Sequence, residues 1–203
     1  MNNINNNTNN NNTKYHSIIL FGFSGSGKST IANLISEKYN LRVIHPSGII
    51  RDLYEKKEID LNNTRYNNGF WESTEGIKLF KSRLNKEKPL DMIADKIIIE
   101  EITKGNIVID SWNLPWLTNI GQKIYLKADL ETRAERVAKR SNITYNKAIN
   151  IVKMKDTETT KLFKRLYGFD IAQDHNVFNY IINTNKLTID NVFKNVCEYI
   201  DKN

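Results

Sequence analysis

The sequence predicts an α/β fold in which a mostly parallel sheet carries helices on both faces. Two observations support this prediction. Short apolar runs rich in β-branched residues alternate with longer amphipathic segments, and a glycine-rich turn joins the first run to the first of these segments. Strands separated by helices form parallel sheets, because the crossover connections place helices on the two faces. With 203 residues and no internal repeat, the chain is expected to form one folded domain over residues 14–203.

The first half of this domain begins with a strand. Ser17–Phe21 (SIILF) is a short apolar run, and Ser29–Tyr39 then places Ile31, Leu34 and Ile35 on one helical side. The elements expected next are a strand over 41–45, a helix from Ile49 onward, an irregular turn-rich segment over 62–70, and helices over 72–86 and 89–104, the last closed by Gly105.

The second half continues the alternation. Apolar runs predict strands over 106–110 (NIVID), 123–127 (KIYLK) and 180–184 (YIINT). Helical spacing predicts helices over 129–140, 144–167 and 188–199, of which the first two are basic.

Composition excludes several classes of protein. No apolar run approaches the roughly 20 residues that span a bilayer, so a membrane protein is not expected. The single cysteine, Cys197, excludes a disulfide scaffold or a Cys-ligated zinc site. The N-terminus lacks the pattern of a secretory signal, so we expect a cytoplasmic location. Residues 1–13 are asparagine-rich and predict a disordered tail. His16, His45 and His175 make no metal-binding spacing, and a structural role is favoured for His45 over contact with a substrate.

The positive charge is concentrated in one region. Of the net charge of +7, an excess of +6 falls within residues 121–170, which hold twelve Lys/Arg against six Asp/Glu. Such an excess indicates a phosphate-rich partner, either a nucleotide or a nucleic acid, although a solvated helical face has the same composition.

The most specific motif is a phosphate-binding loop between the first strand and the first helix. It matches G-x-x-x-x-G-K-[ST], in which glycines let successive backbone N–H groups point at phosphate oxygens and the helix adds its positive end. Lys28 is expected to reach the β- and γ-phosphates of ATP, and the Ser29 hydroxyl to bind Mg²⁺. The motif consists of Gly22, Phe23, Ser24, Gly25, Ser26, Gly27, Lys28, Ser29 and Thr30. The fold expected is therefore a three-layer P-loop NTPase fold.

Asp110 ends an apolar strand and is the expected second group at the Mg²⁺ site, with a turn cap as the alternative. A GTPase is not expected. The nearest match to a guanine-reading Asn-Lys-x-Asp is Asn185–Thr188, which ends in threonine, and no D-x-x-G follows from Asp110. A small kinase fits best.

From Ser17 onward the chain resembles the nucleoside monophosphate kinases, in particular the archaeal-type cytidylate kinases. The resemblance lies in Leu126–Arg140, which is similar to the strand and arginine-rich lid helix of that family, and in the segments Leu166–Ile171 and Phe178–Thr184. It implies transfer of the ATP γ-phosphoryl group to a nucleoside monophosphate, with Mg²⁺, beneath a helical lid over about 133–168.

Several basic residues acquire roles through this resemblance. Arg133, Arg136 and Arg140 share one helix face, and guanidinium groups suit phosphate oxygens. Arg136 and Arg140 are expected to act with Lys28 in catalysis, and Arg133 in substrate binding. The alternative for these three arginines is that they form salt bridges with Glu131 and Glu135 on a solvated helix. Arg51 matches the arginine that holds the acceptor phosphate. Lys155 continues the basic stretch at a place where the family often has arginines. A role at the transferred phosphate and solvation at the surface are equal alternatives for this lysine.

Departures from the family fall on the acceptor side. The usual acidic residue before Arg51 is replaced by Gly48, and the usual glycine-arginine after the metal-binding strand by Ser111, Trp112 and Asn113. Trp112 and Trp116 are open to two interpretations, stacking on a base or capping the core. Asp91 and Asp95 lie at i and i+4 on a predicted helix. For these two carboxylates, exposure to solvent is favoured over hydrogen bonding to a cytosine amino group.

The function predicted is phosphorylation of a nucleoside monophosphate, with CMP or dCMP preferred, by a cytoplasmic monomer. The rival predictions are a kinase of another small molecule on the same fold, and an ATP-dependent RNA- or ribosome-associated protein. Nucleic acid and membranes are not expected as partners.

Overall fold

The computed structural model describes residues 17–64, 69–84 and 89–203. The asparagine-rich segment 1–13 lies outside the described residues. The same holds for the predicted end of the helix over 72–86 and for residues 65–68 of the segment expected to be irregular.

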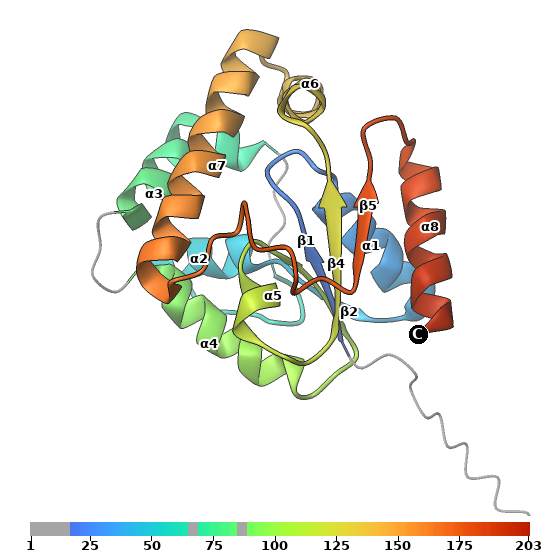
Figure 1. Cartoon of the computed structure of the whole chain (residues 1–203). Coiled ribbons are helices and arrows are strands. Elements are labelled where there is room, and N and C mark those ends of the chain that lie inside the picture. The colour runs from blue at the N-terminus through green and yellow to red at the C-terminus, as the bar shows by residue number, and fades with distance from the viewer. Residues whose placement is uncertain (1–16, 65–68, 85–88) are drawn as a thin grey trace, which may run out of the picture.

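Five parallel strands form a single sheet in the described part of the chain, in the order β2-β3-β1-β4-β5 (Figure 1). All five residues of β1 are buried, which explains why its sequence is a continuous apolar run rather than an alternating one. The strands are β1 (Ser17–Phe21), β2 (Arg42–Ile44), β3 (Ile107–Ser111), β4 (Gln122–Lys127) and β5 (Tyr180–Asn183).

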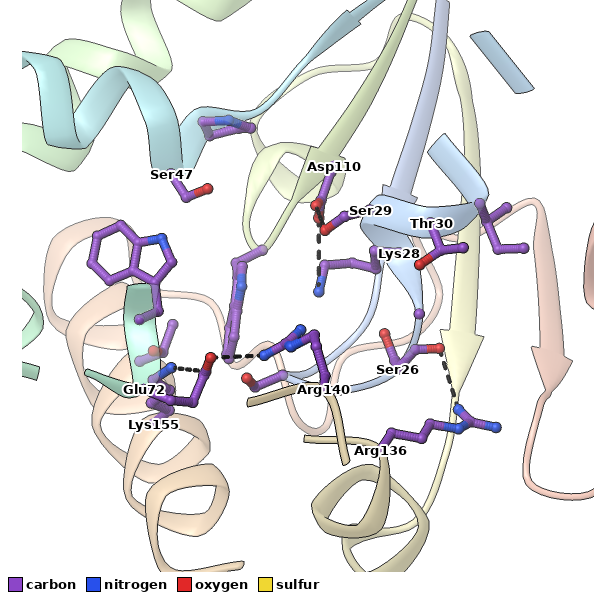
Figure 2. Close-up of a pocket in the computed structure, with 18 of the residues that line it drawn as sticks. Ser26, Lys28, Ser29, Thr30, Ser47, Glu72, Asp110, Arg136, Arg140 and Lys155 are labelled. Carbon is purple, nitrogen blue, oxygen red and sulfur yellow. Dashed lines mark hydrogen bonds and ion pairs between the residues drawn. The ribbon is translucent and has the colours of Figure 1, made fainter. Parts of the chain in front are cut away.

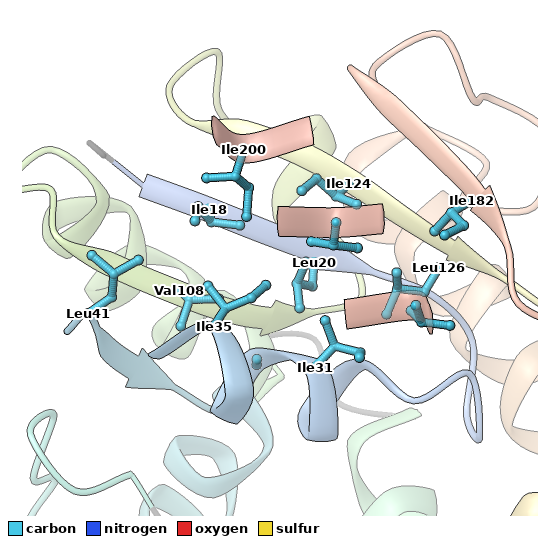
Figure 3. Packing of buried hydrophobic residues seen from close by; sticks show 13 residues of the cluster. Ile18, Leu20, Ile31, Ile35, Leu41, Val108, Ile124, Leu126, Ile182 and Ile200 are labelled. Atoms are coloured by element: carbon cyan, nitrogen blue, oxygen red, sulfur yellow. The ribbon is translucent and has the colours of Figure 1, made fainter. Parts of the chain in front are cut away.

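Two apolar layers cover the sheet. On one face α1 (Lys28–Tyr39) and α8 (Ile189–Lys202) pack on the strands, through the cluster drawn in Figure 3. On the other face α2 (Pro46–Glu55) and α4 (Leu90–Ile102) contribute a second cluster rich in isoleucine. Each fully buried isoleucine contributes about 1.5–3 kcal/mol to folding. The predicted three-layer α/β fold is confirmed.

The remaining helices lie around the carboxyl ends of the strands. Helices α6 (Leu130–Ser141) and α7 (Tyr145–Tyr167) correspond to the basic helices predicted over 129–140 and 144–167, and together they form a hairpin. Arg165 of α7 donates to the Leu84 carbonyl of α3 (Thr74–Leu84), which lies beside α7 in Figure 1. A short 3-10 turn, η1 (Phe70–Glu72), precedes α3. Side chains cap both helices of the hairpin: Asp129 accepts from the Thr132 N–H, and Thr144 from the Lys147 N–H.

Two local details differ from the prediction. Helix α2 begins at Pro46 rather than Ile49, because a proline is favourable in the first helical turn, where its missing N–H is not needed. The helix α5 (Leu114–Leu117) was not predicted, since a single turn is too short for any hydrophobic period to show.

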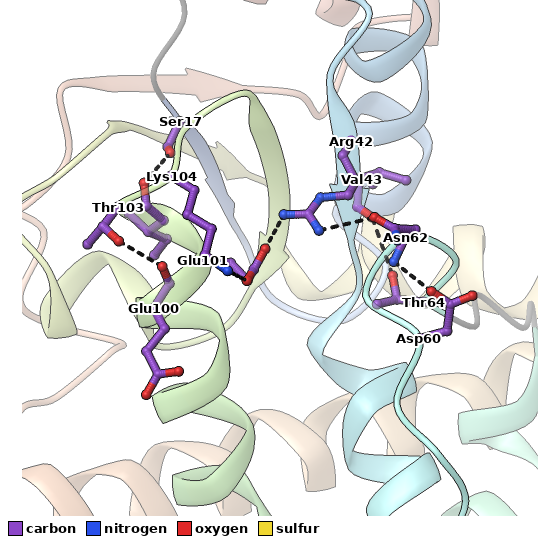
Figure 4. A network of polar contacts seen from close by, with 11 residues as sticks. Ser17, Arg42, Val43, Asp60, Asn62, Thr64, Glu100, Glu101, Thr103 and Lys104 are labelled. Atoms are coloured by element: carbon purple, nitrogen blue, oxygen red, sulfur yellow. Dashed lines mark hydrogen bonds and ion pairs between the residues drawn. The ribbon is translucent and has the colours of Figure 1, made fainter.

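A polar network fixes β2 to its surroundings (Figure 4). Arg42 binds Glu101 at the end of α4, and its Nη1 donates to Asn62 Oδ1 at 3.3 Å. Thr64 Oγ1 accepts from the His45 N–H at 2.9 Å. These contacts hold the short strand in place, and with it the start of α2. Within the described ranges, no helix is long and apolar enough to cross a membrane.

Candidate functional site

The phosphate-binding loop connects the end of β1 to the start of α1. Gly25 and Gly27 have φ values of +83° and +97°, a region that residues with a Cβ rarely adopt. A Cβ on Gly25 would lie 2.5 Å from the carbonyl oxygen of Arg133. Glycine at this position therefore satisfies two requirements, a left-handed backbone and close packing against α6.

Lys28, Ser29 and Asp110 meet at the carboxyl ends of β1 and β3 (Figure 2). These strands are neighbours, with Phe21 paired to Ser111. The Lys28 Nζ lies 3.8 Å from Asp110 Oδ1, and the Ser29 hydroxyl donates to Asp110 Oδ2. This is the arrangement that a phosphate loop and its metal-binding aspartate require.

The electrostatics of this cluster favour an ionised carboxylate. Burial alone would raise the pKa of the Asp110 carboxyl, but Lys28, His45 and Ser29 together lower it to about 2. Burial lowers the pKa of Lys28, and Asp110 opposes that effect. An anionic carboxylate beside a hydroxyl offers hard oxygen donors, so Ser29 and Asp110 fit Mg²⁺. The described residues contain no cluster of three or more His, Cys, Asp or Glu side chains suited to a metal.

A cavity of about 720 Å³ opens in front of the loop. Of the residues predicted to form the site, those that line it are Ser24, Gly25, Ser26, Gly27, Lys28, Ser29, Thr30, Asp110, Arg136 and Arg140. Neither Arg51 nor Arg133 is among the described residues that line the cavity. The Arg51 Nε instead donates to Glu55 Oε1 at 2.7 Å, and its guanidinium lies 4.0 Å from the ring centre of Phe70.

Arg136 and Arg133 of α6 hold backbone carbonyls near the loop. Arg136 donates to the Thr184 carbonyl at 2.6 Å and to the Ser26 carbonyl at 3.4 Å. Arg133 donates to the Ser24 carbonyl at 3.2 Å and pairs with Asp156 of α7 at 2.7 Å. Arg133 thus joins the loop to both helices of the hairpin.

Arg140 faces the cavity and is paired with Glu72 of η1, a residue that the sequence did not single out (Figure 2). Glu72 is 5 % exposed and accepts from Arg140 at 2.8 Å and from Lys155 Nζ at 2.6 Å. Burial would raise the pKa of Glu72, but Lys155 and Arg140 lower it. The surface alternative for Lys155 is wrong, because the side chain is 4 % exposed and needs this carboxylate as partner. Only tertiary structure reveals the pairing, since 83 residues separate the two.

The interpretation of Asp91 and Asp95 as solvent-exposed is also wrong. They are 2 % and 5 % exposed, and both line the cavity. Arg83 of α3 donates to both oxygens of Asp91, and Asp95 accepts from Asn113 and Tyr167. The i, i+4 spacing correctly placed the two carboxylates on one helix face, but it could not show that this face meets α3 and α7. Arg83 carried no signal in the sequence.

Comparison with known proteins settles the family. The sequence model of the cytidylate kinase-like family matches residues 18–186. The chain belongs to this family. Three similar proteins are the cytidylate kinases of Staphylothermus marinus (31% identical, covering 91% of this chain and 96% of that protein), Sulfurisphaera tokodaii (34%, 91% and 94%) and Methanocaldococcus jannaschii (30%, 91% and 97%).

Solved structures support the fold. Shikimate kinase from Bacteroides thetaiotaomicron has a TM-score of 0.56 at 14% identity, covering 91% of this chain and 98% of that chain. An uncharacterized protein from Eubacterium ventriosum also has a TM-score of 0.56, at 15% identity, covering 92% of this chain and 98% of that chain. At such identities the likeness shows the fold alone.

The structure shows where the residues that differ from the family pattern after β3 lie in this cytidylate kinase-like chain. Trp112 lines the cavity, with its ring centre 5.4 Å from Lys28 Nζ, whereas Trp116 packs among Phe21, Phe169 and Phe178 beneath α7. Asn113 is 4 % exposed and donates to Asp95. The departure from glycine-arginine was the signal that could have identified Asn113.

His45, at the start of α2, is 2 % exposed, and its Nδ1 lies 3.6 Å from Asp110 Oδ2. Its burial against Asp110 agrees with the structural role favoured from the sequence.

Proposed function

We propose that this protein transfers the γ-phosphoryl group of ATP to a nucleoside monophosphate, with CMP or dCMP as the preferred acceptor. The observation that carries the proposal is that one cavity joins the phosphate-binding loop, the cation of Arg140 and a buried polar cluster. Membership of the cytidylate kinase-like family supports the same reaction. Phosphoryl transfer needs alignment and positive charge more than covalent chemistry, and this cavity supplies both.

Different residues of the chain are proposed to bind ATP, to hold the metal and to contact the transferring group. The backbone amides of residues 22–30 and the Lys28 side chain bind the ATP phosphates. Ser29 and Asp110 would hold Mg²⁺, which would neutralise phosphate charge. Arg136 and Arg140 close over the transferring group, with Arg140 exchanging Glu72 for a phosphate oxygen. No separate general base is required, because an acceptor phosphate is already ionised at neutral pH.

Two further parts of the proposal concern how the acceptor phosphate is bound and which residues form the lid. Arg51 is proposed to bind the acceptor phosphate after leaving Glu55, and Arg133 to act on substrate through the loop carbonyl of Ser24. Residues of about 133–168 are proposed to move as the lid.

An acceptor panel tests the function. ADP release would be measured with CMP, dCMP, UMP, AMP, GMP and shikimate, each with ATP and Mg²⁺. Turnover stimulated most by CMP or dCMP is expected, and preference for a non-nucleotide would overturn the proposal. Lys28→Met should abolish turnover. Lys38→Met is the matched control, because Lys38 lies on the same helix but pairs at the surface with Asp201.

Two accompanying proposals concern the whole molecule. We propose a cytoplasmic location, supported by a single cysteine, Cys197, which is buried and forms no disulfide within the chain. We also propose a monomer, which sedimentation at micromolar concentration tests.

A further inference from the structure

Trp112 places an aromatic ring beside the lysine of the phosphate-binding loop. The Lys28 Nζ lies over the ring, 5.4 Å from its centre, which is within the range of a cation–π contact. Phe23 of the loop meets the same ring at an interplanar angle of 90°, with 5.7 Å between the two ring centres. Trp112 also lines the cavity, so its ring forms the part of the wall that adjoins the Lys28 ammonium group.

The turn that carries Trp112 is held by the preceding residue, Ser111. Ser111 is 1 % exposed, and its hydroxyl oxygen accepts from the backbone N–H of Asn113 at 3.2 Å and from that of Leu114 at 3.1 Å. The same hydroxyl donates to Asn113 Oδ1 at 3.3 Å. Glycine, which the family pattern has at this position, could make none of these bonds. They fix the backbone around Trp112 and so restrict where its ring can lie.

The ring supplies apolar surface rather than charge. Trp112 stands where the family pattern has an arginine, and an indole cannot replace the positive charge of a guanidinium group. The Lys28 side chain is only 7 % exposed, and that of Asp110, which pairs with it, is 11 % exposed. Water therefore has little access to this end of the cavity, and the Trp112 ring is one of the groups that cover it.

Water competes with the acceptor for the γ-phosphoryl group. In transfer, an oxygen of the acceptor phosphate forms a bond to the γ-phosphorus, and the bond to the bridging oxygen breaks with its electron pair left on ADP. In hydrolysis a water oxygen forms the new bond and the water releases a proton to solvent, so the products are ADP and inorganic phosphate. Both reactions use the same bound ATP and the same Lys28. Exclusion of water therefore decides between them.

We propose that Trp112 directs the γ-phosphoryl group to the acceptor rather than to water, because its ring occupies the space beside Lys28 that water would otherwise fill. Trp112 is then a specificity-determining residue, and Ser111 is the residue that positions it. This inference rests on the proposed function, in which Lys28 binds the ATP phosphates.

The first experiment measures both products in one mixture of ATP, Mg²⁺ and saturating CMP. CDP is measured by chromatography and inorganic phosphate by a colorimetric assay. The ratio of phosphate to CDP reports which nucleophile reacts, because a change in ATP binding or in Lys28 affects both products alike. Trp112→Ala is expected to raise this ratio about tenfold. A folded, active Trp112→Ala protein whose ratio stays within about twofold of the wild-type value would overturn the inference.

Three control variants accompany this measurement. Trp112→Phe keeps an aromatic ring and should give a ratio close to that of the wild type, so a rise as large as that of Trp112→Ala would contradict a role for the ring. Trp116→Phe removes an indole that packs against Phe21 and Phe169 in the core, and its ratio should not change. An equal rise in Trp116→Phe would indicate general loosening and count against the inference. Lys28→Met should release no phosphate, which excludes a contaminating ATPase.

Tryptophan emission gives a second measurement that does not require truncation of the side chain. Because the ring contacts Lys28, a γ-phosphate bound by this lysine should change the emission of Trp112. ADP and the non-hydrolysable β,γ-methylene analogue of ATP are therefore expected to give different emission spectra. The difference should disappear in Trp112→Phe and persist in Trp116→Phe. If Trp112→Ala does not fold, this measurement decides, and equal spectra or a difference that survives in Trp112→Phe would count against the inference.

The outcomes separate this inference from the function itself. Wild-type protein that forms no nucleoside diphosphate from any nucleoside monophosphate refutes the proposed function. An active Trp112→Ala protein with the wild-type ratio of phosphate to CDP refutes only the role of Trp112.

Discussion

Glu72 is a single buried carboxylate that pairs with two cations, so neutralising it should lower the free energy of unfolding. In Glu72→Gln the amide keeps the size and one acceptor but loses the charge. Lys155, 4 % exposed, would then be a buried cation without a counter-charge. Arg140 would lose a partner as well, but its side chain is 34 % exposed and water can replace much of that interaction.

The magnitude follows from these exposures. Removing one partner of a buried ion pair costs about 3–5 kcal/mol, and an exposed pair contributes about 0–1 kcal/mol. Because glutamine still accepts one hydrogen bond, we expect the free energy of unfolding to fall by about 3 kcal/mol. Lys155→Met added to Glu72→Gln should restore most of this loss, since it removes the unpaired charge and leaves an apolar side chain in its place.

Urea denaturation at pH 7.5, followed by circular dichroism and tryptophan fluorescence, measures both values. ATP should raise the midpoint of Glu72→Gln more than that of the wild type, because an anion supplies the charge that the variant lacks. A loss below about 1 kcal/mol, or a double variant less stable than Glu72→Gln, would refute this reasoning.

Three further predictions follow from the site. Gly25→Ala should destabilise the fold by about 1–2 kcal/mol more than Gly168→Ala in urea denaturation: both positions have positive φ, but only a Cβ at Gly25 meets other atoms. The lowered pKa of Asp110 stabilises the fold above about pH 4 and that stabilisation is lost as pH falls toward 2. Wild type should therefore lose about 2 kcal/mol more unfolding free energy than Asp110→Asn between pH 5 and pH 2, and equal losses would contradict the assigned charge. Arg140→Met should lower kcat roughly 100-fold in the ADP-release assay, while Lys153→Met on exposed α7 surface should not; similar effects of both would remove Arg140 from the reaction.

The features predicted best from the sequence are local ones. The run Ser17–Phe21 and the glycine-lysine-serine turn specify a strand, a loop and a helix within a few residues of each other, so periodicity and motif spacing suffice. Asp110 was found because it ends an apolar strand, where the metal-binding aspartate that accompanies a phosphate-binding loop is expected. The structure then places β3 beside β1, so that the carboxyl ends of the two strands meet. The cluster of Lys28, Ser29 and Asp110 was thus predictable before any tertiary contact was known.

The features that were missed depend on contacts between distant segments. Glu72 meets Arg140 across 68 residues and Lys155 across 83, and no local pattern records such a pairing. Charged residues are mostly exposed, which is why Asp91 and Asp95 were expected at the surface. Their burial depends on Arg83, Asn113 and Tyr167, which come from three other parts of the chain.

The attachment of α6 to the phosphate-binding loop limits where the hairpin can pivot. Its first turns are anchored through Arg133 to the Ser24 and Ala128 carbonyls, and Asp129 exchanges two hydrogen bonds with Asn185 after β5. Rotation of the whole hairpin as a rigid body would break these hydrogen bonds, including the one that joins Arg133 to the phosphate-binding loop. Closure of the lid proposed over about 133–168 is therefore expected to pivot at these anchors, so that the largest displacement occurs in the distal turns around residues 141–145 while the phosphate-binding loop keeps its shape.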